Sequence, residues 1–78
     1  MRVPDFLTAL PAIGDGKRDR ILAELEISPV KRLGGLGVRQ RVALQRWLDA
    51  VRAEGLLPEE AVLGQRFYIS LEAQLDLG

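Results

Sequence analysis

Two glycine-containing turns constrain the fold of this chain more than any other feature, because each lies between stretches with helical spacing of apolar residues. The first turn, residues 11–16, falls in Leu-Pro-Ala-Ile-Gly-Asp-Gly-Lys, and the second ends in Gly-Gly-Leu-Gly at residues 34–37. Glycine lets the backbone come close to a ligand. The helix that follows each turn begins with free N–H groups and the positive end of its dipole. The turns therefore predict a helical domain with two helix starts suited to oxyanions.

The spacing of apolar residues predicts three helices before residue 56. The first spans residues 5–10, after Pro4 and before Pro11, and the second spans residues 17–26, with Asp15 as its expected cap. The third and longest spans residues 38–54, with Trp47 in the core and Gly55 just beyond its C-terminus. At 78 residues the chain forms one small domain. The predicted fold class is mainly α.

The last part of the chain changes character. Pro58-Glu59-Glu60 predicts a short helix that ends near Gly64, and apolar residues then alternate with polar ones from residue 69 to residue 77. Alternation of this kind predicts a β-strand, although a helical interpretation through Phe67, Leu71 and Leu75 remains open. A lone strand needs a partner edge, so we expect it to mediate dimerisation or to pair with another protein. The predicted interface consists of Phe67, Ile69, Leu71 and Leu75. We accordingly divide the chain into a core, residues 1–55, and an acidic C-terminal extension, residues 56–78.

The charges are segregated along the chain although the net charge is zero, with 11 basic and 11 acidic residues. Residues 17–46 contain eight cations and three anions, a net +5, whereas residues 47–78 contain two cations and six anions, a net −4. A basic middle followed by an acidic tail predicts a polarised surface.

Several classes of function lack their residues. The chain has no cysteine and no histidine, so it has no disulfide, no thiolate metal site and none of the commonest general bases. We find no catalytic set, and we predict a non-enzymatic protein that needs no cofactor and no metal. Neither a signal peptide nor a membrane-spanning stretch is present in the sequence, so we expect no membrane association and a cytoplasmic, nucleoid-associated location.

Residues 10–48 resemble the helix-two-turns-helix domain of the actinobacterial integration host factor family. The resemblance rests on Leu-Pro-x-Ile-Gly-x-Gly-Lys, then Glu-Leu-Glu-Ile-Ser-Pro, then Arg-Leu-x-Gly-Leu-Gly-x-Arg-Gln-Arg-x-Ala-Leu. The ribosomal and DNA-glycosylase versions of the fold are similar at greater distance. The resemblance implies a nucleoid-associated protein that binds duplex DNA with low sequence specificity, bends it and assists recombination. Glycosylase chemistry does not carry over, because Pro4 is internal and the catalytic domain of those enzymes has no counterpart here.

The family's cations before the Gly-Leu-Gly turn approach the minor groove, and here those positions are Lys31 and Arg32. Gly34 stands where the family usually has a further cation, and only about nine residues precede the motif. We therefore expect a trimmed relative, encoded by a phage or mobile element. Arg39 and Arg41 lie about 200° apart on a helix, so only one can face a groove squarely. The predicted DNA-binding residues are Lys17, Lys31, Arg32, Gly35, Leu36, Gly37, Arg39 and Arg41.

Two other functions remain open. In one, the chain is a protein-interaction module whose C-terminal strand docks on a recombinase, a polymerase or a host protein. In the other, suggested by the ribosomal relatives, the partner is RNA. Competition between duplex RNA and duplex DNA would show which nucleic acid the chain prefers.

Overall fold

The computed structural model describes the backbone of residues 1–77 and the side chains of residues 1–71. Four α-helices and one short 3₁₀ helix follow one another along this part of the chain: α1 (Val3–Thr8), α2 (Asp15–Glu24), η1 (Leu33–Gly35), α3 (Val38–Ala53) and α4 (Glu59–Leu77). The prediction of a mainly α fold is confirmed. The longest helix of the predicted core ends within one residue of its expected position.

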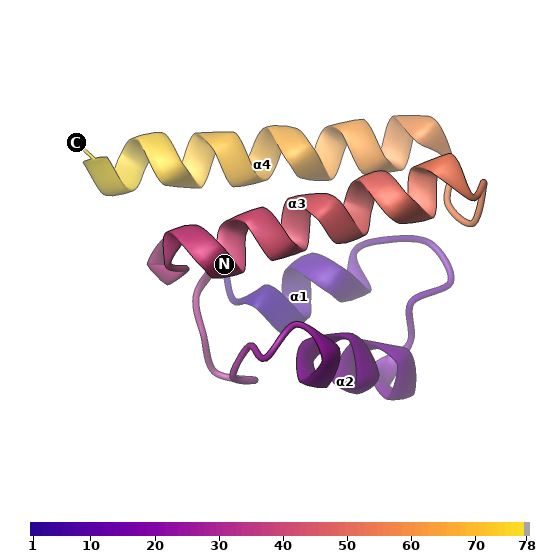
Figure 1. Cartoon of the computed structure of the whole chain (residues 1–78), viewed down its shortest axis with the longest axis horizontal. Helices are drawn as coiled ribbons and strands as arrows, with labels where there is room; N and C mark the ends of the chain where they lie inside the picture. Colours follow the sequence, from indigo (N-terminus) through magenta and orange to yellow (C-terminus); the bar gives the residue numbers. More distant parts are fainter. Residues whose placement is uncertain (78) are drawn as a thin grey trace.

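The two long helices lie side by side and run in opposite directions (Figure 1). In the view of Figure 1, α1 and α2 lie below α3, and α4 forms the upper edge of the molecule. One apolar cluster joins all five elements and the segments between them. Its buried members are Val3, Phe6, Leu7, Leu10, Ile21, Leu22, Ile27, Leu33, Leu36, Leu44, Leu48, Leu57, Val62 and Ile69. Residues after position 55 therefore contribute to the same core as residues before it.

Helix α3 ends where the sequence predicts. Gly55 has φ 71°, its N–H donates to the carbonyl of Arg52 at 3.1 Å, and the N–H of Leu56 donates to the carbonyl of Val51 at 3.0 Å. These two bonds satisfy carbonyls that the last turn of a helix leaves open, and glycine adopts the required positive φ without strain. A similar turn follows α2: Glu26, two residues beyond the helix, has φ 57° although it is not glycine, and the N–H of Ile27 donates to the carbonyl of Leu22 at 2.9 Å.

The expected cap of α2 is wrong. The capping position is Gly14, and Asp15 is already the first residue of the helix. A carboxylate in the first turn is still favourable, because it lies at the positive end of the helix dipole.

The predicted C-terminal strand is wrong, because residues 59–77 form the single helix α4, which continues through Gly64. Its buried residues Val62, Gln65 and Ile69 are spaced by three and four, which is the period of a helix. A helix satisfies its backbone hydrogen bonds internally, whereas a lone strand leaves them open. The alternative helical interpretation through Phe67, Leu71 and Leu75 holds for the backbone.

A buried hydrogen bond attaches α4 to α1. The side-chain amide of Gln65 donates from Nε2 to the carbonyl oxygen of Phe6 at 2.6 Å, and Gln65 is only 8% exposed. The carbonyl of Phe6 is available because α1 tightens at its end, where the N–H of Leu10 donates to Leu7 instead. The last carbonyls of a helix need partners outside it. The bond therefore holds α4 against α1.

Within residues 1–77, no helix is both long enough and apolar enough to cross a membrane.

Candidate nucleic-acid interface

The second glycine turn is attached to the first residues of the chain. The N–H of Val3 donates to the carbonyl of Lys31 at 2.9 Å, and the N–H of Leu33 donates to the carbonyl of Met1 at 2.8 Å. Between these bonds Arg2 and Arg32 form an antiparallel β-bridge. Both arginines are exposed and have extended backbones, with φ −84° and −85°. The pairing therefore brings a third cation, Arg2, to the predicted pair Lys31 and Arg32.

Sequence reasoning missed Arg2 as a candidate. It lies 29 residues before Lys31 and outside the resembling stretch. The only local signal is a cation between two apolar residues, Met1 and Val3, which fits a short extended segment. That pattern is too short to show where the segment pairs.

Three predicted residues of the turn, Gly35, Leu36 and Gly37, have backbone N–H groups that already donate within the protein, to the carbonyls of Arg32 and Leu33 and to Oε1 of Gln40. Leu36 is 4% exposed, so its side chain belongs to the core. A Cβ atom at Gly35 would lie 3.9 Å from Cε of Lys31, so the lysine stem passes over this glycine. Gly37 occupies the capping position of α3 with an extended backbone. The first turn of α3 follows directly, and its N–H groups lack acceptors within the helix.

Gln40 holds the start of α3 in place. Its Oε1 accepts the N–H of Gly37 at 3.4 Å, and its Nε2 donates to the carbonyl of Glu26 at 3.3 Å. The side chain thus links the end of α2 to the beginning of α3. This is a structural role for the glutamine of the Arg-Gln-Arg motif.

The structure separates Arg39 and Arg41, as the helical spacing predicts. Arg39 is exposed and lines a shallow hollow together with Glu24 and Glu26, at the end of α2. Arg41 is half-buried. A phosphate at Arg39 would approach two carboxylates, so Arg39 is the least favourable of the predicted contacts.

Lys17 lies away from the second turn. It lines an apolar hollow of about 200 Å³ with Arg20, beside Trp47 and Val51 of the second half of α3. These two positions are 10 and 14 residues beyond Gly37, which corresponds to roughly 15–20 Å along a helix. Trp47, predicted to be core, is half-buried and packs against the core at this hollow. The structure therefore does not bring Lys17 close to Lys31 and Arg32.

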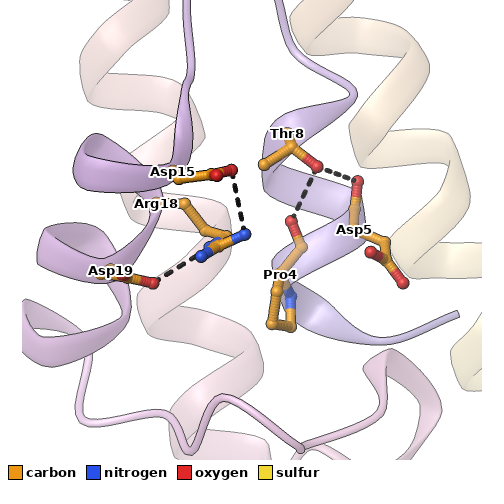
Figure 2. Close-up of polar contacts among 6 residues, drawn as sticks. All are labelled: Pro4, Asp5, Thr8, Asp15, Arg18 and Asp19. Carbon is orange, nitrogen blue, oxygen red and sulfur yellow. Dashed lines mark hydrogen bonds and ion pairs between the residues drawn. The ribbon is translucent and has the colours of Figure 1, made fainter.

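Three arginines away from the second turn form ion pairs with carboxylates. Figure 2 shows Arg18 between Asp15 and Asp19, at 3.2 Å and 3.0 Å. The side-chain hydrogen bond to Asp19 raises the pKa of Arg18. In the same view, the hydroxyl of Thr8 donates to the carbonyl of Pro4 at 3.2 Å within α1.

The other two ion pairs lie along the contact between α3 and α4. Arg52 pairs with Glu59, and Arg66 pairs with Asp49 at 3.0 Å. By contrast, Arg2, Lys31 and Arg32 have no carboxylate within ion-pair distance among the side chains of residues 1–71. We call these three residues the bridge cluster.

The predicted interface residues on α4 do not share one face. Ile69 is 2% exposed and belongs to the core, so it is not available to a partner. Phe67 and Leu71 are exposed, and together with Leu63 they follow one another at intervals of four residues. Side chains at this spacing lie on one side of a helix. The side chain of Leu75 lies outside the described residues.

Comparison with known proteins supports the expected resemblance. The chain is 51% identical over 49 residues to the integration host factor of Mycolicibacterium smegmatis, covering 63% of this chain and 47% of that protein. It is 54% identical over 44 residues to the integration host factor of Mycobacterium tuberculosis, covering 56% and 42%. It is also 78% identical over 37 residues to a dihydroneopterin aldolase of Methylorubrum extorquens, covering 47% of this chain and 28% of that protein.

The chain spans less than half the length of these relatives. No solved structure matches it. The family of S13-like H2TH domains matches residues 1–47, which include α1, α2, η1 and most of α3. The resemblance to the actinobacterial integration host factors is thereby confirmed, and the chain belongs to the family of S13-like H2TH domains.

Proposed function

We propose that this chain is a non-enzymatic protein that binds the phosphate backbone of duplex DNA through the second glycine turn. The observation that carries the proposal is the bridge cluster, where Lys31 and Arg32 precede η1 without a carboxylate partner among the described side chains. Cations of this kind exchange their counterions for phosphates, which favours binding. Membership of the H2TH family and the likeness to integration host factors support the same function.

The geometry favours contact with the backbone over reading of the bases. The first turn of α3, which follows η1 by two residues, has backbone N–H groups without acceptors inside the helix, and these can meet a phosphate. Phosphate contacts position a protein on DNA but carry no sequence information. We therefore propose low sequence specificity. On the likeness to integration host factors, we also propose a location on the nucleoid and a role in bending DNA during recombination.

The test is fluorescence anisotropy of a labelled random duplex of about 25 base pairs in a salt series. Four phosphate contacts predict a slope of about −3.6 for log K against log salt concentration. Replacement of Lys31 and Arg32 by alanine is expected to weaken binding and to make the slope shallower by at least about 0.9, because at least one phosphate contact is lost.

A matched control carries Arg52→Ala and Arg66→Ala, which removes the same number of charges from the contact between α3 and α4. This control is expected to bind within about twofold of the wild type, because long-range effects of exposed charges are screened by salt. Absence of binding by the wild type at low salt contradicts the proposal. Equal losses in both double variants contradict the assigned site and indicate attraction by net charge.

Competition with unlabelled duplex RNA of the same length tests the alternative partner. DNA that competes at least tenfold better than RNA supports the proposal. RNA that competes better contradicts it, because A-form RNA has a different groove geometry.

The exposed residues of α4 favour self-association as a second candidate function. Leu63, Phe67 and Leu71 present apolar side chains at helical spacing on the surface, with Tyr68 45% exposed beside them. A second copy of the chain would bury this face and double the number of cations that meet the DNA. Sedimentation equilibrium of the wild type and of Phe67→Ser/Leu71→Ser checks this: a dimer lost in the variant supports it, and a monomeric wild type contradicts it.

A further inference from the structure

We infer that Arg2 is a DNA-binding residue, and that Arg2 and Arg32 hold one phosphate group between them. The inference rests on the proposed function and extends it to a residue outside the predicted set. Its basis is the β-bridge that places the two arginines opposite each other.

The hydrogen-bond pattern fixes how close the two arginines are. The bonds run from Val3 to Lys31 and from Leu33 to Met1, so they flank the bridge and do not join Arg2 to Arg32 directly. In such a non-hydrogen-bonded pair the Cα atoms are about 4.5 Å apart and the two side chains leave the backbone on the same face. Both side chains are exposed, so the two guanidinium groups share one region of solvent.

This arrangement is unfavourable in the protein alone. Like charges directly opposite each other across a strand pair destabilise it. Three other arginines have carboxylate partners, as Arg18 shows with two. At the bridge, no described carboxylate within ion-pair distance does the same. An anion between the two guanidinium groups removes the repulsion and gains charge-assisted hydrogen bonds.

A phosphodiester group meets this requirement. Its oxygens accept hydrogen bonds from two directions, and the planar guanidinium group matches that geometry. The neighbouring Lys31 lies on the same short segment and adds a third positive charge for an adjacent phosphate. Nucleic acid provides such phosphates at regular spacing.

The experiment compares Arg2→Gln, Arg32→Gln and the double variant with the wild type and with Arg52→Gln as a control for charge. Arg52 already pairs with Glu59 and lies near the opposite end of α3, roughly 20 Å along the helix from its first turn. Anisotropy of the labelled duplex gives the affinity and the salt slope. Thermal unfolding at low salt shows whether each variant keeps its fold.

We expect Arg2→Gln and Arg32→Gln each to weaken binding by roughly tenfold, as for the loss of a charged hydrogen bond. Each single variant still contacts the shared phosphate, so its salt slope stays close to that of the wild type. The double variant loses one phosphate, and its slope becomes shallower by about 0.9. The melting temperature of Arg2→Gln is expected to equal or exceed that of the wild type, because a repulsion is removed.

Three results would overturn the inference. The first is wild-type binding that Arg2→Gln leaves unchanged. The second is a loss of affinity that accompanies a lower melting temperature, which makes Arg2 a structural residue. The third is a slope that becomes shallower by about 1.8 in the double variant, which indicates two separate phosphates. If the wild type itself fails to bind DNA, the proposed function and this inference fail together; if only Arg2→Gln is silent, the inference alone fails.

Discussion

Arginines at the two ends of α3 have opposite surroundings. Near its C-terminal end, Arg52 and Arg66 join α3 to α4 through Glu59 and Asp49. Near its N-terminal end, the bridge cluster gathers Arg2, Lys31 and Arg32 with no described carboxylate partner. The same type of side chain therefore serves the fold at one end and remains available to a ligand at the other. Residue type and net charge alone do not reveal this difference.

The largest expected effect concerns the α4 side of the comparison. Ile69→Ala is expected to lower the free energy of unfolding by about 2–4 kcal/mol, because a fully buried side chain leaves a cavity. Phe67→Ala, two residues away but exposed, is expected to change it by no more than about 0.5 kcal/mol. Urea unfolding followed by circular dichroism measures both. Similar losses at the two positions would contradict the helix, since residues 67 and 69 share a face only in a strand.

The next effect comes from the bond between α4 and α1. Gln65→Leu leaves the carbonyl of Phe6 without its partner, which is expected to cost about 1–3 kcal/mol. Gln45→Leu, at a half-buried glutamine of α3, serves as the control and is expected to stay within about 0.5 kcal/mol. Denaturant unfolding checks the pair. A neutral Gln65→Leu would mean that the carbonyl finds water or another donor.

Two matched arginine substitutions sharpen the comparison between the two ends of α3. Arg32→Ala is expected to weaken binding to duplex DNA by roughly tenfold without loss of stability, because a charged contact disappears. Arg66→Ala is expected to leave the affinity within twofold and to lower stability by at most about 1 kcal/mol, as for other exposed ion pairs. Anisotropy and thermal unfolding of the same two preparations give both quantities. Arginines that behave alike in both assays would remove the distinction.

The smallest effect adds stability to α4. Gly64 lies inside the helix, and nothing lies within 4 Å of the position where a Cβ would stand. Gly64→Ala is therefore expected to raise the free energy of unfolding by roughly 0.5–1 kcal/mol. Gly55→Ala is the matched control. Because residue 55 has φ 71°, this substitution is expected to lower the free energy of unfolding by about 1–2 kcal/mol. Thermal unfolding of both variants tests the signs, and a destabilising Gly64→Ala would show that the helix is broken there.

The sequence was most informative where a local rule determines the structure. The end of α3 follows from Gly55, and the long helix follows from the spacing of Leu44 and Leu48, which are both fully buried. The strand prediction failed because exposed apolar residues of α4, such as Leu71, fall at every second position relative to the buried Ile69. A period of two then coincides with a helix that has apolar residues on two sides.

The candidate site was predictable only in part. Lys31 and Arg32 could be named because the motif around them is local. Arg2 and Gln65 could not, since each acts through a partner that is far away in the sequence. Long-range pairing of this kind depends on the packed core, which no short window of residues contains.

The bridge between Arg2 and Arg32 also affects how folding and binding are coupled. It closes about thirty residues of chain, so the two arginines meet only in the folded state, and closing such a loop costs entropy. A nucleic acid that holds both binds the native state alone and adds RT ln(1 + [L]/Kd) to its stability, about 2.7 kcal/mol at a hundredfold excess over Kd. In a chain with no cysteine, duplex DNA would thus act as a reversible cross-link between the first residues and the second turn.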